Sequence, residues 1–313
     1  MQRYGRTKAQ KLSYIRRNYD LYLLMLPALV YIIIFNYLPM FGIVIAFEKY
    51  NMFASTNPIT SIFASKWVGF DNFIKLFNGY DFKKIFRNTL VISLLKIIFI
   101  FPLPILCAII LNEINNIAYK RTVQTIIYLP YFLSWAVVSG IFVTLLGSTG
   151  VVNRGLNAIG VGSINFLSSK SWFRSVLVFT DAWKSVGWGS IVYIAAIAGV
   201  DPGLYEVAML DGAGKLRQMW NITLPSIMPT IVMMLILRVG NLLNAGFEQI
   251  FVMYNSTVYE VADIIGTYVY REGLGKMNFS FGTAVGLFNS VVSLILVVGS
   301  NALSKRATGR SIW

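Results

Sequence analysis

Five ionisable residues lie within stretches that are otherwise apolar and long enough to cross a bilayer: Lys96, Asp181, Lys184, Arg238 and Glu248. An unpaired charge at the centre of a bilayer costs about 2.5–3.5 kcal/mol or more. Five such charges must therefore pair with one another or face water. Asp181 and Lys184 are three residues apart, so we expect them to pair on one helix. The set predicts either ion pairs that hold a helical bundle together or a polar path for a solute, and the residue types leave both open.

Aromatic and amide side chains accompany these charges along the same stretches. A sugar ring has apolar C–H faces and a polar hydroxyl edge, which suit aromatic faces and amide or carboxylate groups respectively. Any one aromatic residue can equally pack the bundle or mark the membrane interface. The five charges are three cations and two anions, so their net charge of +1 points toward an anionic solute. We predict a substrate path formed by Tyr131, Trp135, Asp181, Trp183, Lys184, Trp188, Asn241, Asn244, Phe247, Glu248 and Gln249.

The elements that must position these side chains are helices in a membrane. Of 313 residues, 56% are hydrophobic and only 13% are charged, whereas a soluble domain carries roughly 25% charged residues. The mean hydropathy is +0.65. The formal net charge of +14 comes from basic residues at segment ends, as membrane orientation requires, and no motif that reads nucleic acid is present. We therefore expect an all-α polytopic membrane protein without a nucleic-acid partner.

The composition argues against catalytic sites and metal sites. The chain has no histidine and a single cysteine. This removes histidine-based catalytic triads, most zinc sites and any intrachain disulfide. We expect no catalytic residue, no metal site and no cofactor bound by this chain.

Hydropathy predicts six membrane-spanning helices in one membrane domain, residues 20–305. The spans are Leu21–Phe47, Arg87–Leu111, Thr122–Gly147, Trp172–Val200, Ser226–Tyr254 and Ser280–Ser304. Residues 1–19 form a basic segment, either an amphipathic helix on the membrane surface or a disordered tail, and residues 306–313 form a second tail. The distribution of basic residues places both termini in the cytoplasm. Gly282 and Gly286 have the spacing of a close helix contact.

A polar stretch, residues 201–225, separates the fourth and fifth predicted spans. Asp201, followed by proline, is typical of a helix start, and Gly212 supplies a bend. We expect a second short turn at Lys215–Trp220, and Thr223 as the cap of the next long helix. The same orientation count places this stretch in the cytoplasm.

Part of this stretch resembles a phosphate-binding loop but lacks two residues that such a loop requires. Gly212-Ala213-Gly214-Lys215 has the glycines and lysine, but such a loop needs another glycine five residues before Gly214 and Ser or Thr after the lysine. Those positions hold Met209 and Leu216. The chain is therefore not expected to bind ATP.

The stretch as a whole resembles the cytoplasmic "EAA" loop of binding-protein-dependent ABC importer permeases. The matching residues run over Glu206–Ala213 and Ile222–Pro225. The sequence departs from the family pattern twice, with Val207 in place of alanine and Met219 in place of phenylalanine, and both substitutes are apolar. Residues Tyr31–Tyr50 are similar to sugar-importer permeases of the complex-oligosaccharide branch, so the resemblance extends over nearly the whole chain.

The resemblance implies a maltose-transporter-like permease of the type I ABC importer fold in a bacterial plasma membrane. The chain would form half of a translocation pathway for an oligosaccharide, an acidic one derived from a polysaccharide being one option. Its implied partners are a second, different permease subunit, an ATPase dimer that binds ATP and Mg²⁺, and an extracellular solute-binding lipoprotein. It would not itself be an enzyme. The residues that would couple it to the ATPase are Glu206, Ala208, Asp211, Gly212, Ala213, Leu224 and Pro225.

Two other classes of function remain open from the residues alone. One is a self-sufficient secondary transporter driven by an ion gradient, with Asp181 and Glu248 as coupling carboxylates. It lacks a visible inverted repeat and leaves residues 206–225 unexplained. The other is a membrane scaffold or sensor that transports nothing.

Overall fold

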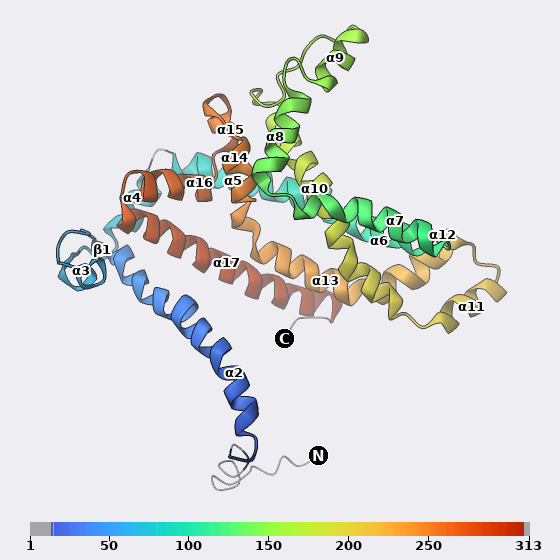
Figure 1. Ribbon diagram of the computed structural model, residues 1–313, viewed down its shortest axis with the longest axis horizontal. Coiled ribbons are helices and arrows are strands. Elements are labelled where there is room, and N and C mark those ends of the chain that lie inside the picture. The colour runs from blue at the N-terminus through green and yellow to red at the C-terminus, as the bar shows by residue number, and fades with distance from the viewer. Residues whose placement is uncertain (1–13, 15, 80, 310–313) are drawn as a thin grey trace.

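The computed structural model describes residues 14, 16–79 and 81–309. Most of the basic segment predicted at residues 1–19 lies outside this part of the chain, as does the end of the tail predicted at 306–313. The described residues form an almost entirely helical protein (Figure 1). The predicted all-α membrane fold is confirmed.

Five helical stretches among the described residues are long and apolar enough to cross a membrane. They are Tyr19–Phe47, Phe82–Asn112, Trp135–Ala158, Lys215–Gly240 and Phe279–Arg306. The pair α10 (Phe173–Ala198) and α11 (Pro202–Leu210) counts as a sixth span when taken together, with a bend of 72° between the two helices. The predicted number of six is met only with this bent pair.

The first half of the first span makes little contact with the rest of its own chain. The span begins as α2 (Tyr19–Ile32), continues through a π-helical turn η1 (Ile33–Tyr37) and ends as the 3₁₀ segment η2 (Leu38–Phe47). No residue of α2 is buried, and Figure 1 shows this helix running away from the body of the protein. By contrast, η2 packs against α17 (Phe279–Thr308).

The predicted third span is broken near its middle. Helix α7 (Ile117–Tyr128) ends at a short 3₁₀ turn η3 (Leu129–Phe132), and α8 (Trp135–Leu146) begins after it. Pro130 lacks a backbone N–H, so it cannot continue the hydrogen bonding of α7. Ser134 then caps α8 by accepting a hydrogen bond from the Val137 N–H at 3.3 Å. The uninterrupted span predicted over Thr122–Gly147 is therefore wrong. The apolar stretch found here is α8 with α9 (Val151–Ala158).

The predicted fifth span also ends early. A continuous helix formed by α12 (Lys215–Gln218), the π-helical turn η4 (Met219–Thr223) and α13 (Leu224–Gly240) stops at Gly240. The 3₁₀ turn η5 (Leu242–Asn244) and two residues with positive φ, Ala245 and Gly246, then reverse the backbone before α14 (Phe247–Met253). The prediction of one helix over Ser226–Tyr254 is thus wrong, since its second half belongs to α14.

Helix α10 lies at the centre of the bundle. It packs against α5 (Phe82–Ile100), α6 (Pro102–Asn112), α7 and α13. One buried cluster joins Phe173 and Leu177 of α10 to Ile250 of α14, and another joins its Tyr193 to α6 and α13. Within a bilayer lipid is as apolar as leucine, so such contacts stabilise the bundle by close packing rather than by removing surface from water.

A small lobe lies at the end of the molecule opposite α11 (Figure 1). Its two-residue strands β1 (Glu48–Lys49) and β2 (Lys66–Trp67) pair antiparallel, with helix α3 (Pro58–Ala64) between them in sequence and α4 (Asp71–Asn78) after them. The backbone N–H of Tyr50 donates to Ser280 Oγ at 2.8 Å, which fixes the lobe to the start of α17.

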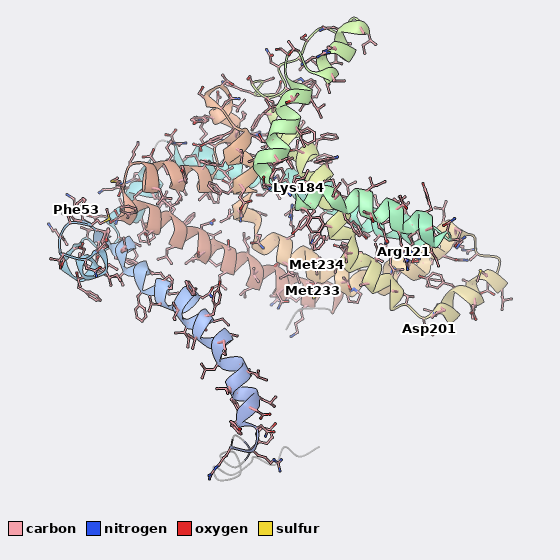
Figure 2. All side chains as sticks on the ribbon, viewed as in Figure 1. Phe53, Arg121, Lys184, Asp201, Met233 and Met234 are labelled. Atoms are coloured by element: carbon pink, nitrogen blue, oxygen red, sulfur yellow. The ribbon has the colours of Figure 1, made fainter. Side chains whose placement is uncertain are left out.

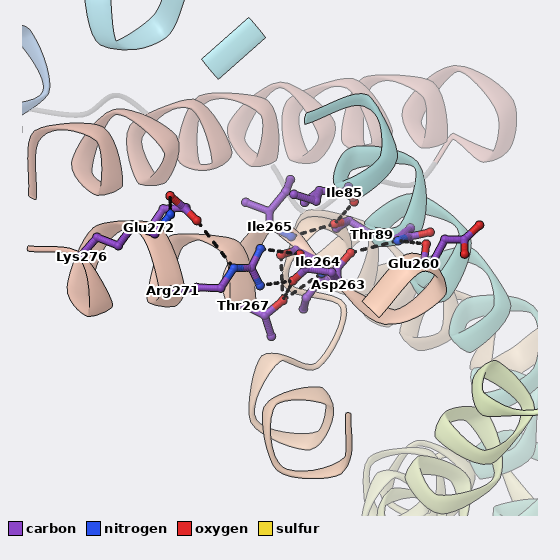
Figure 3. A network of polar contacts seen from close by, with 11 residues as sticks. Ile85, Thr89, Glu260, Asp263, Ile264, Ile265, Thr267, Arg271, Glu272 and Lys276 are labelled. Atoms are coloured by element: carbon purple, nitrogen blue, oxygen red, sulfur yellow. Dashed lines mark hydrogen bonds and ion pairs between the residues drawn. The ribbon is translucent and has the colours of Figure 1, made fainter. Parts of the chain in front are cut away.

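The connector between α14 and α17 is held by a polar network, shown in Figure 3. It comprises η6 (Ser256–Val258), α15 (Tyr259–Ala262), α16 (Ile265–Val269) and the π-helical η7 (Tyr270–Gly275). Arg271 lies 2.7 Å from the Asp263 carboxylate, and Thr267 Oγ1 donates to the same carboxylate at 2.6 Å. This partnership raises the pKa of Arg271 above its ordinary value. Because Asn88 of α5 donates to the backbone of the same segment, the network anchors the connector on the bundle.

Three glycines differ in how closely their helices approach other backbone. A Cβ at Gly187 of α10 would overlap the backbone carbonyl of Ile127 on α7, so these helices cross at van der Waals contact. A Cβ at Gly282 would lie 3.0 Å from the Cα of Gly273, which is also a close approach, whereas no atom lies within 4 Å of a Cβ at Gly286. The predicted close contact is therefore confirmed at Gly282 and absent at Gly286 within the described chain.

The change Gly187→Ala is expected to destabilise the protein, because the methyl group meets backbone that cannot move aside, and overpacking typically costs about 1–3 kcal/mol. Gly286→Ala is the matched control, since alanine favours a helix by about 1 kcal/mol over glycine and has open space there. Thermal unfolding of the purified protein measures both. Equal midpoints for wild type and Gly187→Ala would contradict the close crossing of α7 and α10.

Candidate functional site

Lys96 of α5 occupies the break between α13 and α14. Its side chain is 4% exposed, and its Nζ lies 3.0 Å from Asp181 Oδ2 and donates to Gln249 Oε1. Gln249 is fully buried and donates in turn to Leu177 O and Thr180 Oγ1, both at 2.7 Å. All the polar atoms of Gln249 are thus engaged within the bundle, and they fix α14 to α10 and α5.

Asp181 pairs with cations on two other helices and not with Lys184. Besides Lys96, Arg238 of α13 lies 3.9 Å from the same carboxylate oxygen. The predicted pair of Asp181 and Lys184 on α10 is therefore wrong. The reason lies in the break after α7, where backbone carbonyls lack their helical partners and attract the Lys184 ammonium.

Lys184 binds the backbone at the break between α7 and α8. Its Nζ donates to Tyr131 O at 2.7 Å, to Pro130 O at 3.4 Å and to Leu133 O. The ammonium also lies 5.3 Å from the centre of the Tyr131 ring and 5.6 Å from that of Trp135. Figure 2 shows Lys184 at the junction of α10 with the α7–α8 break. A single buried cation thus satisfies carbonyls that neither water nor the helix can reach.

Several of the predicted aromatic residues pack against one another. Tyr131 and Trp188 stack with ring centres 4.6 Å apart and an angle of 5°, and Phe132 meets Trp188 edge to face at 5.4 Å. Trp183 makes an edge-to-face contact with Phe142 at 5.4 Å. Trp183 and Trp188 each remain about two-fifths exposed despite these contacts. The exposed part of each side chain faces the outside of the protein.

A cavity of about 450 Å³ opens between α5, α10 and α13, beside the α13–α14 break. Four predicted path residues line it: Trp135, Asp181, Asn241 and Asn244. Its other lining residues are Ser93, Lys96, Ile97, Met234, Leu237, Arg238, Leu242, Ala245 and Gly246. Met234 is labelled on α13 in Figure 2. The remaining predicted residues do not line this cavity: Tyr131, Trp183, Lys184, Trp188, Phe247, Glu248 and Gln249.

Three charged residues line the cavity, and their sum is positive. Lys96 and Arg238 contribute two positive charges and Asp181 one negative charge, which gives +1. Lys96 and Arg238 stood out in the sequence as charges in apolar stretches but were not placed in the predicted path. The signal that could have found them is the run from Asn241 to Gly246, whose turn-forming residues interrupt a span.

Phe247 and Glu248 lie beyond the break, on α14. Phe247 stacks on Phe251 at 5.4 Å, while the Glu248 side chain is exposed. Among the described residues, no group of three or more His, Cys, Asp or Glu side chains is placed to hold a metal ion. The chemistry available in the cavity is therefore hydrogen bonding, aromatic contact and charge.

The polar stretch at residues 201–225 forms a second candidate site at the far end of the molecule. Asp201 caps α11 by accepting from the Gly203 N–H at 2.9 Å, as predicted. Gly212 has φ +74°, and Gly212 N and Ala213 N donate to Met209 O at 3.1 Å and Ala208 O at 2.8 Å. These two bonds form a Schellman motif, which terminates the helix and needs a left-handed residue at Gly212.

Side-chain contacts fold the two halves of this stretch together. Tyr205 and Thr223 join through their hydroxyl groups at 2.9 Å, and Gln218 Nε2 donates to Ala213 O at 2.8 Å. Thr223 is therefore not the helix cap that we predicted. The helix already begins at Lys215, and the π-helical turn before α13 accommodates Pro225, whose missing N–H would otherwise break the helix.

The outer surface of this stretch combines apolar and charged side chains. Leu210, Leu216 and Trp220 are 88%, 72% and 68% exposed. Glu206 and Asp211 are also exposed, as are Lys215 and Arg217, whereas Leu224 packs on the buried cluster that contains Ile227. A surface that exposes large apolar side chains among charged ones has the character of a protein docking site.

The change Lys96→Met is expected to destabilise the protein, because removing one partner of a buried ion pair typically costs about 3–5 kcal/mol. The double variant Lys96→Met with Asp181→Asn removes the stranded carboxylate and should recover part of the loss. Thermal unfolding of the purified protein measures both. If the single and double variants unfold at the same temperature, the pair does not hold the break as described.

Comparisons with known proteins place this geometry in a family. Residues 100–309 match the family model described as "Binding-protein-dependent transport system inner membrane component". The chain is 46% identical to Protein LplB of Bacillus subtilis (strain 168), over 93% of this chain and 90% of that protein. It is 45% identical to the polygalacturonan/rhamnogalacturonan transport system permease protein YteP of the same organism, over 96% and 91%.

A solved structure matches the whole fold. The crystal structure of a bacterial ABC transporter involved in the import of the acidic polysaccharide alginate contains a chain with a TM-score of 0.86 and 42% identity, covering 95% of this chain and 99% of that one. A second structure of an alginate transporter, in complex with an alginate pentasaccharide-bound periplasmic protein, matches equally well. The helical architecture, the spans and these matches agree: the chain belongs to the family of binding-protein-dependent ABC transport permeases.

Proposed function

We propose that this chain is one of two permease subunits of an ABC importer that carries an acidic, polysaccharide-derived oligosaccharide into a bacterial cell. The observation that carries the proposal is the cavity at the α13–α14 break, with its net positive charge. Its volume of about 450 Å³ lies within the range of small-ligand sites. Of the similar proteins, one at 45% identity is named for polygalacturonan/rhamnogalacturonan transport and one at 42% identity belongs to an importer of alginate, which supports an acidic sugar.

The cavity has the groups that a uronic sugar needs. Trp135 offers an aromatic face to the C–H side of a ring, and the amides of Asn241 and Asn244 suit its hydroxyl edge. Arg238 presents a planar guanidinium that matches a carboxylate with two parallel hydrogen bonds. A neutral sugar would leave this cation without a ligand in the cavity.

A partner ATPase, which binds ATP and Mg²⁺, docks on α11 and the Schellman turn. Its hydrolysis of ATP moves this stretch. Glu206 offers a carboxylate to a basic residue of that partner, and Leu210 and Trp220 supply the apolar contact. The contacts from Tyr205 and Gln218 make the stretch move as one body. A displacement of α11 is passed directly to α10, the helix that carries Asp181.

The rest of the assembly follows from the same orientation. With α11 in the cytoplasm, both termini are cytoplasmic and the β1–β2 lobe faces outward, where a solute-binding lipoprotein delivers the sugar. A second, different permease subunit completes the pathway. The ion-coupled alternative gains no support, since Asp181 is engaged by Lys96 and Arg238 and family membership implies an external energy source.

Glu206→Ala and Gly212→Val are expected to reduce uptake and substrate-stimulated ATPase activity of the assembled transporter at least tenfold, a loss of about 1.4 kcal/mol in coupling. The first removes the docking carboxylate and the second forces a branched side chain into a left-handed turn. Gly160→Val is the matched control, since Gly160 has φ +77° and open space but lies far from the stretch in sequence. Normal uptake in both loop variants would refute the docking role.

Wild-type transporter in proteoliposomes, with its binding lipoprotein, should import a uronic oligosaccharide and discriminate against its carboxyl-reduced, neutral analogue at least tenfold, the ratio that about 1.4 kcal/mol provides. Uptake of radiolabelled sugar measures this directly. Equal uptake of the acidic and neutral forms would remove acidity from the proposed substrate class.

A further inference from the structure

The two contacts of Asp181 are unequal. Its carboxylate lies 3.0 Å from Lys96 but 3.9 Å from Arg238, which is the outer limit of an ion pair. The side chains of Lys96 and Arg238 are 4% and 43% exposed. Lys96 is thus enclosed and firmly paired, while the Arg238 guanidinium is loosely held and reaches into the cavity.

Arg238 has hydrogen-bonding capacity to spare. A guanidinium carries five N–H donors, and a carboxylate in good geometry takes two of them at about 2.7–2.9 Å. Among the described residues, Asp181 is the only anion that forms an ion pair with Arg238. A carboxylate arriving in the cavity can therefore make a better contact with Arg238 than Asp181 does.

Release of Arg238 would leave no buried charge without a partner. Asp181 keeps Lys96 at 3.0 Å, and Lys96 also keeps its hydrogen bond to Gln249. The incoming carboxylate neutralises Arg238. Because each ion retains a counter-ion, the exchange avoids the large penalty of an unpaired buried charge.

The Asp181–Arg238 contact also joins two helices that are connected by residues 201–225, the proposed coupling stretch. Asp181 is on α10, which leads into α11, and Arg238 is on α13, which continues from α12. Residues 201–214 connect these same two helices at the end that the proposed ATPase contacts. The Asp181–Arg238 contact is thus a cross-link between the two arms of the coupling stretch.

We propose that the Asp181–Arg238 contact is a latch that the substrate opens. In the empty transporter Asp181 serves as the resident counter-ion of Arg238 and ties α10 to α13. A substrate carboxylate takes the place of Asp181 on Arg238 and frees the two helices to move relative to each other. Occupancy of the cavity is thereby transmitted to the ATPase. This inference rests on the proposed transport of an acidic oligosaccharide.

The test uses the whole transporter, with partner permease, ATPases and binding lipoprotein, in proteoliposomes. Arg238→Gln opens the latch and leaves the Lys96–Asp181 pair intact, so it is not expected to strand a buried charge. We expect its ATPase activity without substrate to rise at least about fivefold, the lower end of typical coupling between sites. Its preference for uronic over carboxyl-reduced oligosaccharide should fall to near unity.

Two further variants define the outcome. Arg238→Lys keeps the positive charge and should keep the low basal activity of the wild type. Arg306→Gln makes the same change of charge at the end of α17, outside the cavity, and should match wild type.

The failure of the latch and that of the proposed substrate class give different results. Wild-type basal activity and wild-type substrate preference in Arg238→Gln would overturn the latch while leaving acidic import intact. Equal uptake of acidic and neutral sugar by the wild type would instead overturn the substrate class, and with it the proposed opening by a carboxylate.

Discussion

Backbone groups that leave a helix inside a membrane must find partners within the protein, because the hydrocarbon offers none. This chain interrupts its helices at the ends of two apolar spans, between α7 and α8 and between α13 and α14, and a buried lysine lies at each interruption. Lys184 takes the carbonyls that follow α7, and Lys96 occupies the reversal before α14. The two lysines are carried by α10 and α5, neighbouring helices near the centre of the bundle. The charge of Lys96 in turn requires Asp181, whose carboxylate also lies beside Arg238 at the cavity.

The same arrangement links the proposed binding region to the proposed docking surface. Helix α10 carries both Lys184 and Asp181 and runs to Ala198, where the chain bends by 72° into α11. The Schellman turn at Gly212 and the Tyr205–Thr223 contact then join α11 to the helix that returns as α13. A force applied at α11 therefore reaches the two helices that border the cavity. In the proposed function, the charges beside the cavity are both structural supports and the groups that a solute meets.

Local patterns predicted the first half of the stretch at residues 201–225 but not its second half, where the helix begins at Lys215 and Thr223 is no cap. Its helix cap at Asp201 and left-handed Gly212 depend on neighbouring residues, which a sequence displays directly. The spans followed from hydropathy, but their breaks did not, since Leu129–Leu133 and Leu242–Ala245 are largely apolar and hardly lower a hydropathy average. The pairing of the charges was missed because Lys96 and Asp181 meet only through the fold, while Lys184 at three residues' distance from Asp181 looked like the nearer partner.

The amide of Gln249 shows the same limit. Its residue type suited a sugar, yet it is fully buried and engaged by Lys96, Leu177 and Thr180. Arg238, in contrast, lines the cavity. The sequence indicates only that it is a charge within an apolar stretch. Sequence alone cannot separate a polar group that holds two helices from one that is available to a ligand.

In the proposed function, the cavity beside the α13–α14 break receives the acidic sugar and Arg238 binds its carboxylate. The decisive experiment is a structure of the assembled transporter with a uronic oligosaccharide trapped in the pathway. We expect a sugar carboxylate about 2.8 Å from the Arg238 guanidinium, with Asp181 displaced from Arg238 and still paired with Lys96. A sugar bound elsewhere in the pathway, with the Asp181–Arg238 contact unchanged, would contradict it.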